Sequence, residues 1–332
     1  MPTERSRQRR RPLRTALIVL VSCAALVGGL FVLLDQGIGP LPDPRRCQAR
    51  VGEVTVDLTQ EQAENAAIIS AVAVRRGLPA RAASIALATA FQESKLRNLD
   101  HGDRDSLGLF QQRPSQGWGT AEQIQRPFYA TRKFYDALEK IDGYQSMRIT
   151  VAAQRVQRSG FPEAYEDHAA DGRALASALT GNSAARFTCV VRDREGDMAL
   201  ESPGRNGLTP RADRVRRELK RAFGDLALGG FAAGGVSTGH MRGSAHYDGR
   251  ALDVFVRPVT AANRRRGWAM ASYLVAHASR LQVDHVIFDA RIWSAGLRSE
   301  AGWRDYDPGS ARGDSAVLEH RDHVHVDVPS GS

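Results

Sequence analysis

Residues 320–328 read HRDHVHVDV, a stretch that combines three histidines with alternating polar and apolar residues. Successive side chains of a strand point to opposite faces, so His323, His325 and Asp327 share one face and the valines share the other. We expect the valines to pack on a core. We therefore predict a strand here, in a segment of alternating helices and β-rich runs from about residue 208 onward, which is typical of an α+β domain.

A second stretch, residues 244–253 (SAHYDGRALD), has a histidine and an aspartate on either side of a glycine. A tight turn at Gly249 can bring His246 back towards Asp253. Two imidazoles and one carboxylate form a ligand set that leaves the fourth position of a catalytic zinc open for water. Two interpretations without a metal site stay open: the histidines can be solvated or hydrogen-bonded, and HVHVDV can be an edge strand with a polar face.

The two stretches together contain Ser-x-His-x-x-Gly-x-Ala-x-Asp and His-x-x-His-x-His. This pair of motifs resembles the zinc D-alanyl-D-alanine carboxypeptidase and murein endopeptidase family, over roughly residues 208–328. The resemblance implies one zinc ion (Zn²⁺), bound by His246, Asp253 and His325, in a metallopeptidase that cuts cell-wall peptides. It also implies that His320 and His323 position water and steady the oxyanion. Asp322 occupies the position of an acidic base in some relatives, but it is one methylene shorter than glutamate. Arg242 is the candidate for substrate binding by its position.

The segment from residue 55 to residue 189 has helical spacing and almost no strand signal, which predicts an all-helical domain. Its first helix begins with Thr59-x-x-Gln62, a capping-box pattern, and its second begins near Pro79. The second helix delivers Glu93 to a helix end beside an apolar interior, where a carboxyl group can act as a general acid. The non-catalytic alternative is a solvated glutamate at a helix terminus.

The Glu-Ser pair at residues 93–94 is followed, after a loop, by GLFQ at residues 108–111. This pattern resembles the lytic transglycosylase and goose-type lysozyme family, over roughly residues 58–179. The resemblance implies a lysozyme-like fold in which Glu93 is the acid that cleaves the glycan strand, with Gln111 and Gln112 near the substrate. The Ala-Tyr-Asn stretch of that family is missing from the later helix, and Tyr165 is the nearest tyrosine that can replace it.

The N-terminus consists of a basic block followed by residues 15–34, which carry no charge. A helix of that length rises about 30 Å, which is enough to cross a bilayer. The preceding arginines predict a single-pass membrane protein with a cytoplasmic N-terminus and extracytoplasmic domains. The alternatives are a cleaved signal peptide and lipoprotein-type cleavage at Cys23. The predicted order is cytoplasmic tail 1–14, transmembrane helix 15–34, linker 35–54, lysozyme-like helical domain 55–189, linker 190–207, and zinc-peptidase-like domain 208–332.

Three cysteines are present, and Cys47 and Cys189 are the two outside the predicted membrane span. In an oxidising exterior such a pair is a candidate disulfide. Two unrelated free thiols are the alternative.

The formal net charge of +9 favours an anionic partner, but much of it lies in the N-terminal arginines, so we expect no specific nucleic-acid binding. The two resemblances together imply a membrane-anchored peptidoglycan hydrolase that acts on glycan strands and stem peptides. A non-catalytic peptidoglycan-binding or scaffolding protein with both folds is the alternative, and a surface metal-binding protein is a third interpretation.

Overall fold

The computed structural model describes residues 47–161, 163–192, 196, 199–310 and 312–331. Residues Met1–Pro44 and Arg45–Ser332 divide into two units, and the fold described below belongs to the second. Within the described residues, no helix has the length and apolar character needed to cross a membrane. The predicted transmembrane helix, residues 15–34, lies outside the described residues.

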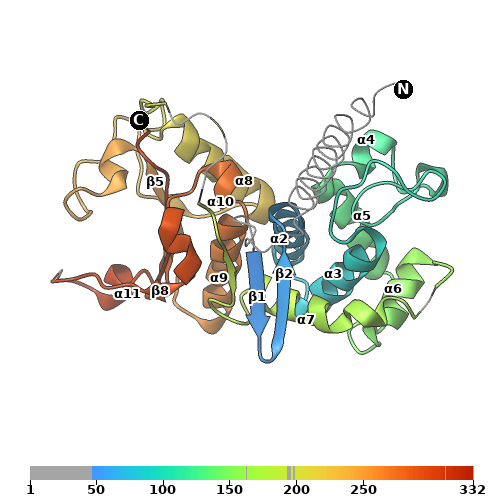
Figure 1. Ribbon diagram of the computed structural model, residues 1–332. Helices are drawn as coiled ribbons and strands as arrows, with labels where there is room; N and C mark the ends of the chain where they lie inside the picture. Colours follow the sequence, from blue (N-terminus) through green and yellow to red (C-terminus); the bar gives the residue numbers. More distant parts are fainter. Residues whose placement is uncertain (1–46, 162, 193–195, 197–198, 311, 332) are drawn as a thin grey trace, which may run out of the picture. The chain divides into compact units, whose positions relative to one another are not determined.

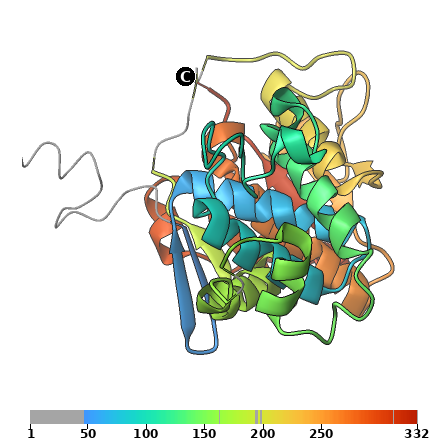
Figure 2. The same ribbon diagram turned by 90° about the vertical axis from the view of Figure 1, so that its right-hand side faces the viewer.

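The first part of the fold contains a three-stranded antiparallel sheet in the order β2-β1-β3. Strands β1 (Cys47–Val51) and β2 (Val54–Leu58) form a hairpin, drawn in blue in Figures 1 and 2. Strand β3 (Phe187–Cys189) returns from the far end of the segment to pair with β1. The prediction of an all-helical domain here is therefore wrong, because short strands far apart in sequence pair with each other.

Helices occupy most of the segment between β2 and β3. Two helices begin where the sequence predicts. Thr59 and Gln62 form the capping box of α2, and Pro79 precedes the first turn of α3. The helices and 3₁₀ turns of this segment are α2 (Gln60–Arg75), α3 (Ala80–Ser94), η2 (Pro114–Gln116), α4 (Ala121–Ile124), α5 (Pro127–Leu138), α6 (Ile149–Gln157), η3 (Glu166–His168) and α7 (Ala169–Leu179).

The alanine-rich helix α3 packs closely against α7. At Gly172 of α7, an added Cβ would lie only 2.6 Å from the carbonyl oxygen of Ser84, so the two backbones touch where a larger residue would force them apart. This close packing fixes α3, and therefore the position of Glu93 near its end.

The second part is built on a six-stranded antiparallel sheet in the order β4-β5-β9-β6-β7-β8. Its strands are β4 (Leu228–Gly229), β5 (Ala251–Phe255), β6 (His285–Phe288), β7 (Arg291–Ser294), β8 (Arg304–Asp305) and β9 (His323–Asp327). Its helices and 3₁₀ turns are α8 (Pro210–Phe223), η4 (Ala245–Asp248), α9 (Ala261–Ala276), α10 (Ala278–Leu281), η5 (Gly296–Ala301) and α11 (Ser315–Leu318).

Helix α9 joins the two parts of the fold. It contacts α2, α7 and β3 of the first part, and β6 and β9 of the sheet (Figure 1). The buried apolar residues of both parts form one continuous core. The predicted fold class, an all-helical domain followed by a separate α+β domain, is thus replaced by one compact unit with helices and two antiparallel sheets.

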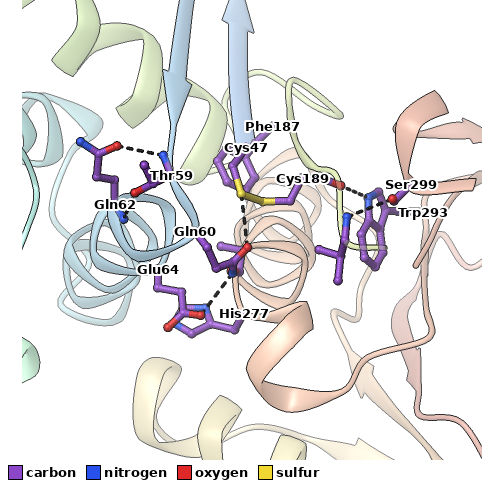
Figure 3. The surroundings of a disulfide bond; sticks show 12 residues. Cys47, Thr59, Gln60, Gln62, Glu64, Phe187, Cys189, His277, Trp293 and Ser299 are labelled. Carbon is purple, nitrogen blue, oxygen red and sulfur yellow. Dashed lines mark hydrogen bonds between the residues drawn. A yellow bond between two sulfur atoms is a disulfide. The ribbon is translucent and has the colours of Figure 1, made fainter. Parts of the chain in front are cut away.

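A disulfide between Cys47 and Cys189 closes the first part (Figure 3). The two residues lie directly opposite each other on β1 and β3, and both are fully buried. Beside this bridge, the indole of Trp293 on β7 donates a hydrogen bond of 3.2 Å to the carbonyl of Cys189. His277, labelled in the same view, is buried against Tyr273, and burial lowers its pKa to about 3, so it packs as a neutral core side chain.

Replacing both Cys47 and Cys189 with serine should lower the free energy of unfolding by about 5 kcal/mol, since the bridge closes a loop of 142 residues. Urea unfolding in an oxidising buffer measures this loss. Cys23→Ser, which leaves the bridge intact, is the matched control. A loss below about 1 kcal/mol in the double variant would show that the bridge does not restrict the unfolded chain.

Candidate active sites

The first candidate site lies on two central strands of the six-stranded sheet. Asp253 on β5 pairs directly with His325 on β9, so both side chains emerge on the same face. Val324 and Val326 alternate with these residues and are fully buried in the core. The alternation of HVHVDV therefore separates a core face from a face that carries acidic and imidazole groups.

His246 reaches the same point from the short turn η4. Ser244 caps this turn, and Gly249 ends it with a left-handed backbone (φ 67°). A Cβ at Gly249 would lie 2.3 Å from the carbonyl oxygen of Gly207, so glycine is required for space as well as for backbone conformation. The turn brings His246 next to Asp253 although the two residues are separated along the chain.

Three donor atoms converge at this point. Nε2 of His246 lies 3.0 Å from Nδ1 of His325 and 3.3 Å from Oδ1 of Asp253. The third separation, between Nδ1 of His325 and Oδ1 of Asp253, is 3.1 Å. Ligands held at about 2.0–2.1 Å around a tetrahedral zinc ion are about 3.3 Å apart, so the donor set and its dimensions fit such an ion.

Outer hydrogen bonds set the orientation of both histidines. Nδ1 of His246 donates to the carbonyl of Gly230 at 2.7 Å, which leaves the lone pair of Nε2 facing the other two donors. At Gly230 an added Cβ would lie 2.3 Å from the ring of His246, so only glycine permits this approach. Nε2 of His325 is 3.4 Å from Oδ2 of Asp327, which turns Nδ1 towards Asp253. Such outer partners are typical of metal-binding histidines.

Charge is concentrated in this buried cluster. Burial lowers the pKa of His325, but the hydrogen bonds and negative charges of Asp253 and Asp327 outweigh burial and raise it to about 9. The pKa of Asp253 falls well below its usual range, because hydrogen bonds and charge from His246 and His325 outweigh its burial. The metal-free cluster therefore holds a proton on His325, at the point where the three donors meet.

Asp327 in turn is held by His285. The ring of His285 on β6 donates from Nδ1 to Oδ1 of Asp327 at 2.9 Å, and the two residues pair across neighbouring strands. The pKa of His285 is raised, because the bond to Asp327 outweighs burial. His285 is thus a supporting residue for the cluster, one step removed from the three donors.

Replacing Asp327 with asparagine should weaken metal binding by about 10–100-fold. Asparagine lacks the carboxylate that orients His325 and makes its imidazole more basic. Competition with a chelating dye measures the affinity. Asp103→Asn, at an exposed loop position, is the control for the same change of charge. An unchanged affinity in the Asp327 variant would mean that His325 is oriented by other contacts.

His320, His323 and Asp322 surround the cluster. Nδ1 of His323 donates to Asp322 at 2.6 Å, and Asp322 also accepts from Nε of Arg257 at 2.7 Å. Asp322, the residue expected at the position of an acidic base, is therefore occupied by two hydrogen bonds. Nε2 of His323 faces Oδ1 of Asp253 at 3.8 Å. The arrangement makes His323 the better-placed base, with Asp322 as the residue that orients it.

The ring of His320 packs against that of His323, with centroids 4.6 Å apart. Its Nδ1 is buried and finds no hydrogen-bond partner among the described residues. Burial, together with the charges of His325 and His323, lowers its pKa to about 3, so this imidazole is neutral. A neutral imidazole beside the three converging donor atoms can contact a substrate or a water molecule.

His240 is a residue that the motifs assign to no role. Its ring stacks on that of His246 with centroids 3.8 Å apart, and it offers a donor atom within 4.8 Å of those of His246 and Asp253. Burial and the charge of His246 lower its pKa. The nearby Arg242 is exposed and forms no hydrogen bond or ion pair with any described residue.

The second candidate site is Glu93, in the last turn of α3. The hydroxyl of Tyr165 donates to Oε1 of Glu93 at 2.6 Å, and Nε2 of Gln157 donates to the same oxygen at 3.1 Å. Burial and the negative charge of Glu93 raise the pKa of Tyr165 above its usual range, so the phenol keeps its proton. Tyr165 thus reaches Glu93 across 72 residues of sequence.

Glu93 is also tied to the GLFQ segment. Gln157 donates to the carbonyl of Phe110 at 2.7 Å, and the hydroxyl of Ser94 donates to the carbonyl of Leu109 at 2.8 Å. The two glutamines expected near substrate make other contacts. Gln112 is buried and donates to the carbonyl of Ala130, while Gln111 donates to the carbonyls of His101 and Gly108. Neither forms a hydrogen bond with Glu93 in the described structure.

Part of the chain matches a protein-family model. Residues 204–316 match the family described as "VldE, C-terminal domain". The matched segment contains His246 and Asp253 and ends before His320, His323 and His325. No curated protein matches the chain.

Proposed function

We propose that this protein is a peptidoglycan hydrolase with two catalytic centres, a metal-dependent one for peptides and an acid-dependent one for glycan strands. The observation that carries the proposal is the convergence of His246, Asp253 and His325 on one point, with 3.0–3.3 Å between their donor atoms. The two motifs of the sequence resemble those of zinc D,D-peptidases, and that resemblance supplies the substrate class.

At the metal centre, His246, Asp253 and His325 would hold a zinc ion, which when bound would polarise a substrate carbonyl and make water more acidic. His325 must release its proton from Nδ1 before it can bind, while Asp327 keeps its ring oriented. His323, oriented by Asp322, can take a proton from water through Nε2. The neutral imidazole of His320 can steady the oxygen on which negative charge develops.

At the acid centre, Glu93 would donate a proton to the oxygen of the scissile glycosidic bond. Tyr165 and Gln157 both donate to Oε1, so the acidic proton belongs on Oε2, where the described residues place no hydrogen-bond donor. These two bonds also fix the direction of the carboxyl group. Fixed orientation is a main source of rate enhancement in general acid catalysis.

The proposed partners are the glycan strands and stem peptides of peptidoglycan, and the proposed location is the outer side of a membrane, with residues 15–34 as the anchor. The Cys47–Cys189 disulfide supports an extracytoplasmic location, because such bonds persist in oxidising compartments.

Incubation of the full chain with purified peptidoglycan and zinc, followed by mass spectrometry, tests this function. We expect shortened glycan fragments and cleaved stem peptides, and a chelator should stop only the release of peptide products. Glycan products that differ by one water distinguish hydrolysis from transglycosylation. Binding to peptidoglycan without any products would contradict hydrolysis and favour the wall-binding alternative.

A further inference from the structure

A cavity of about 730 Å³ lies between the three-stranded sheet and the outer strands β7 and β8 of the six-stranded sheet. Neither Glu93 nor any of the candidate metal ligands lines it. Its lining is unusually rich in cationic groups and contains five arginines: Arg50, Arg186, Arg264, Arg291 and Arg321.

Two aspartates in the lining balance only some of these charges. Asp289 accepts from Arg264 at 2.6 Å and from Arg321 at 3.2 Å, and Asp305 pairs with Arg291 at 2.6 Å. Arg50 donates to the neutral side chain of Gln48, and Arg186 has no side-chain partner among the described residues. Neither of these two arginines pairs with a carboxylate in the part of the chain that the structure describes. The cavity therefore has an excess of positive charge.

The two arginines without carboxylate partners lie directly opposite each other. The backbone amide of Arg50 on β1 donates to the carbonyl of Arg186 at 2.9 Å, which extends the register that pairs Gln48 with Thr188. All four side chains line the cavity, and the alternate residues Cys47 and Ala49 are buried on the other face. Like charges directly opposite on neighbouring strands destabilise a sheet, so this pairing costs stability unless an anion lies between them.

Thr188 adds a neutral donor to this pair. Its hydroxyl oxygen is buried and finds no hydrogen-bond partner among the described residues. The residue facing it is Gly302, where even an added Cβ would lie 3.3 Å from that oxygen, so no side chain of this residue competes for the hydroxyl. Two guanidinium groups and one hydroxyl together offer more hydrogen-bond donors than the two oxygens of a single carboxylate accept. They suit a tetrahedral oxyanion, which guanidinium groups bind with two parallel hydrogen bonds.

We propose that this cavity binds the phosphate groups of an anionic phosphodiester polymer, with Arg50, Arg186 and Thr188 as the binding residues. The cavity is much larger than one phosphate group, which favours a segment of polymer over a free ion. This site is separate from both candidate catalytic centres and does not depend on their activity. It holds the protein on a polyanion while the catalytic centres act elsewhere.

The test uses the full chain with inorganic phosphate and with polyphosphate as probes. Both should raise the melting temperature of wild type, because a ligand that binds the folded state stabilises it. In the double variant Arg50→Gln/Arg186→Gln, affinity for polyphosphate measured by calorimetry should fall at least about tenfold. Without a probe, the double variant should melt at the same temperature as wild type or higher, because the like-charge pair is gone.

Arg214→Gln, an exposed position on α8, is the control for loss of one positive charge. It should bind polyphosphate as wild type does. The proposal is overturned if the double variant keeps wild-type affinity, or if Arg214→Gln weakens binding as much. Equal affinity for polyglutamate and polyphosphate would overturn the assignment to phosphate, since it would show that any polyanion suffices.

Discussion

Replacing His246 or His325 with alanine is expected to abolish the binding of about one equivalent of zinc by the chain. Either substitution removes one of the three donor atoms that lie 3.0–3.3 Å from one another. The two remaining groups cannot complete the set of three protein ligands that such a site requires. Metal analysis of the purified protein, after equilibration with zinc and removal of the excess, measures the change.

His101→Ala is the matched control, because His101 is exposed and lies in a distant loop. This variant should keep its metal. Stoichiometric zinc in both the His246 and His325 variants would show that the ion binds elsewhere, for example with His240 as a ligand. A triple variant that also lacks His240 distinguishes that possibility from a site outside the cluster.

Zinc binding should also weaken in acid. The pKa of His325 in the metal-free cluster is about 9, so below that pH the metal must displace a proton from Nδ1. Displacement of one proton lowers the apparent affinity about tenfold for each unit by which the pH falls. A zinc affinity that does not change between pH 8 and pH 6 would contradict this assignment of the proton.

Glu93→Gln is expected to lower the rate of glycan cleavage by about 10²–10⁴-fold, the usual contribution of a general acid. Glutamine keeps an oxygen that can accept from Tyr165 and Gln157, so the local fold is retained, but it has no acidic proton to donate. The rate of release of glycan fragments from purified peptidoglycan measures the effect. Release of peptide products should be unchanged, because the metal centre is intact.

Glu53→Gln, in the exposed turn between β1 and β2, is the control for loss of one carboxylate. Tyr165→Phe adds a finer test, since it removes one of the two bonds that orient Glu93 and should slow cleavage less than Glu93→Gln. Equal rates in wild type and the Glu93 variant would refute the role of Glu93. A wild-type protein that releases no glycan fragments would refute the glycan-cleaving activity itself.

Several features of this protein follow from local sequence alone. The capping box of α2 depends on Thr59 and Gln62, three residues apart, and such short-range hydrogen bonds can be recognised from residue type. The alternation of HVHVDV separates valines from His323, His325 and Asp327 because a strand has a period of two. The turn at Gly249 is equally local, and it brings His246 towards Asp253.

Sequence patterns did not predict the three short strands of the first sheet. Strands β1, β2 and β3 have five, five and three residues, too few for a clear alternation, and β3 pairs with β1 from the far end of the segment. Their pairing depends on long-range contacts, which single-sequence periodicity does not contain. For the same reason the core that α9 shares with both sheets was not predicted, and one compact unit replaces the expected pair of domains.

The sequence by itself identified the candidate catalytic groups: the carboxyl group of Glu93 at a helix end, and the histidines and aspartate of the two motifs. Only the tertiary structure decided what holds and directs them. Tyr165 reaches Glu93, the carbonyl of Gly230 fixes His246, and Asp322 turns towards His323 and Arg257. The physical reason is that residue type and spacing specify local backbone and face, whereas hydrogen-bond partners across tens of residues exist only after the chain has packed.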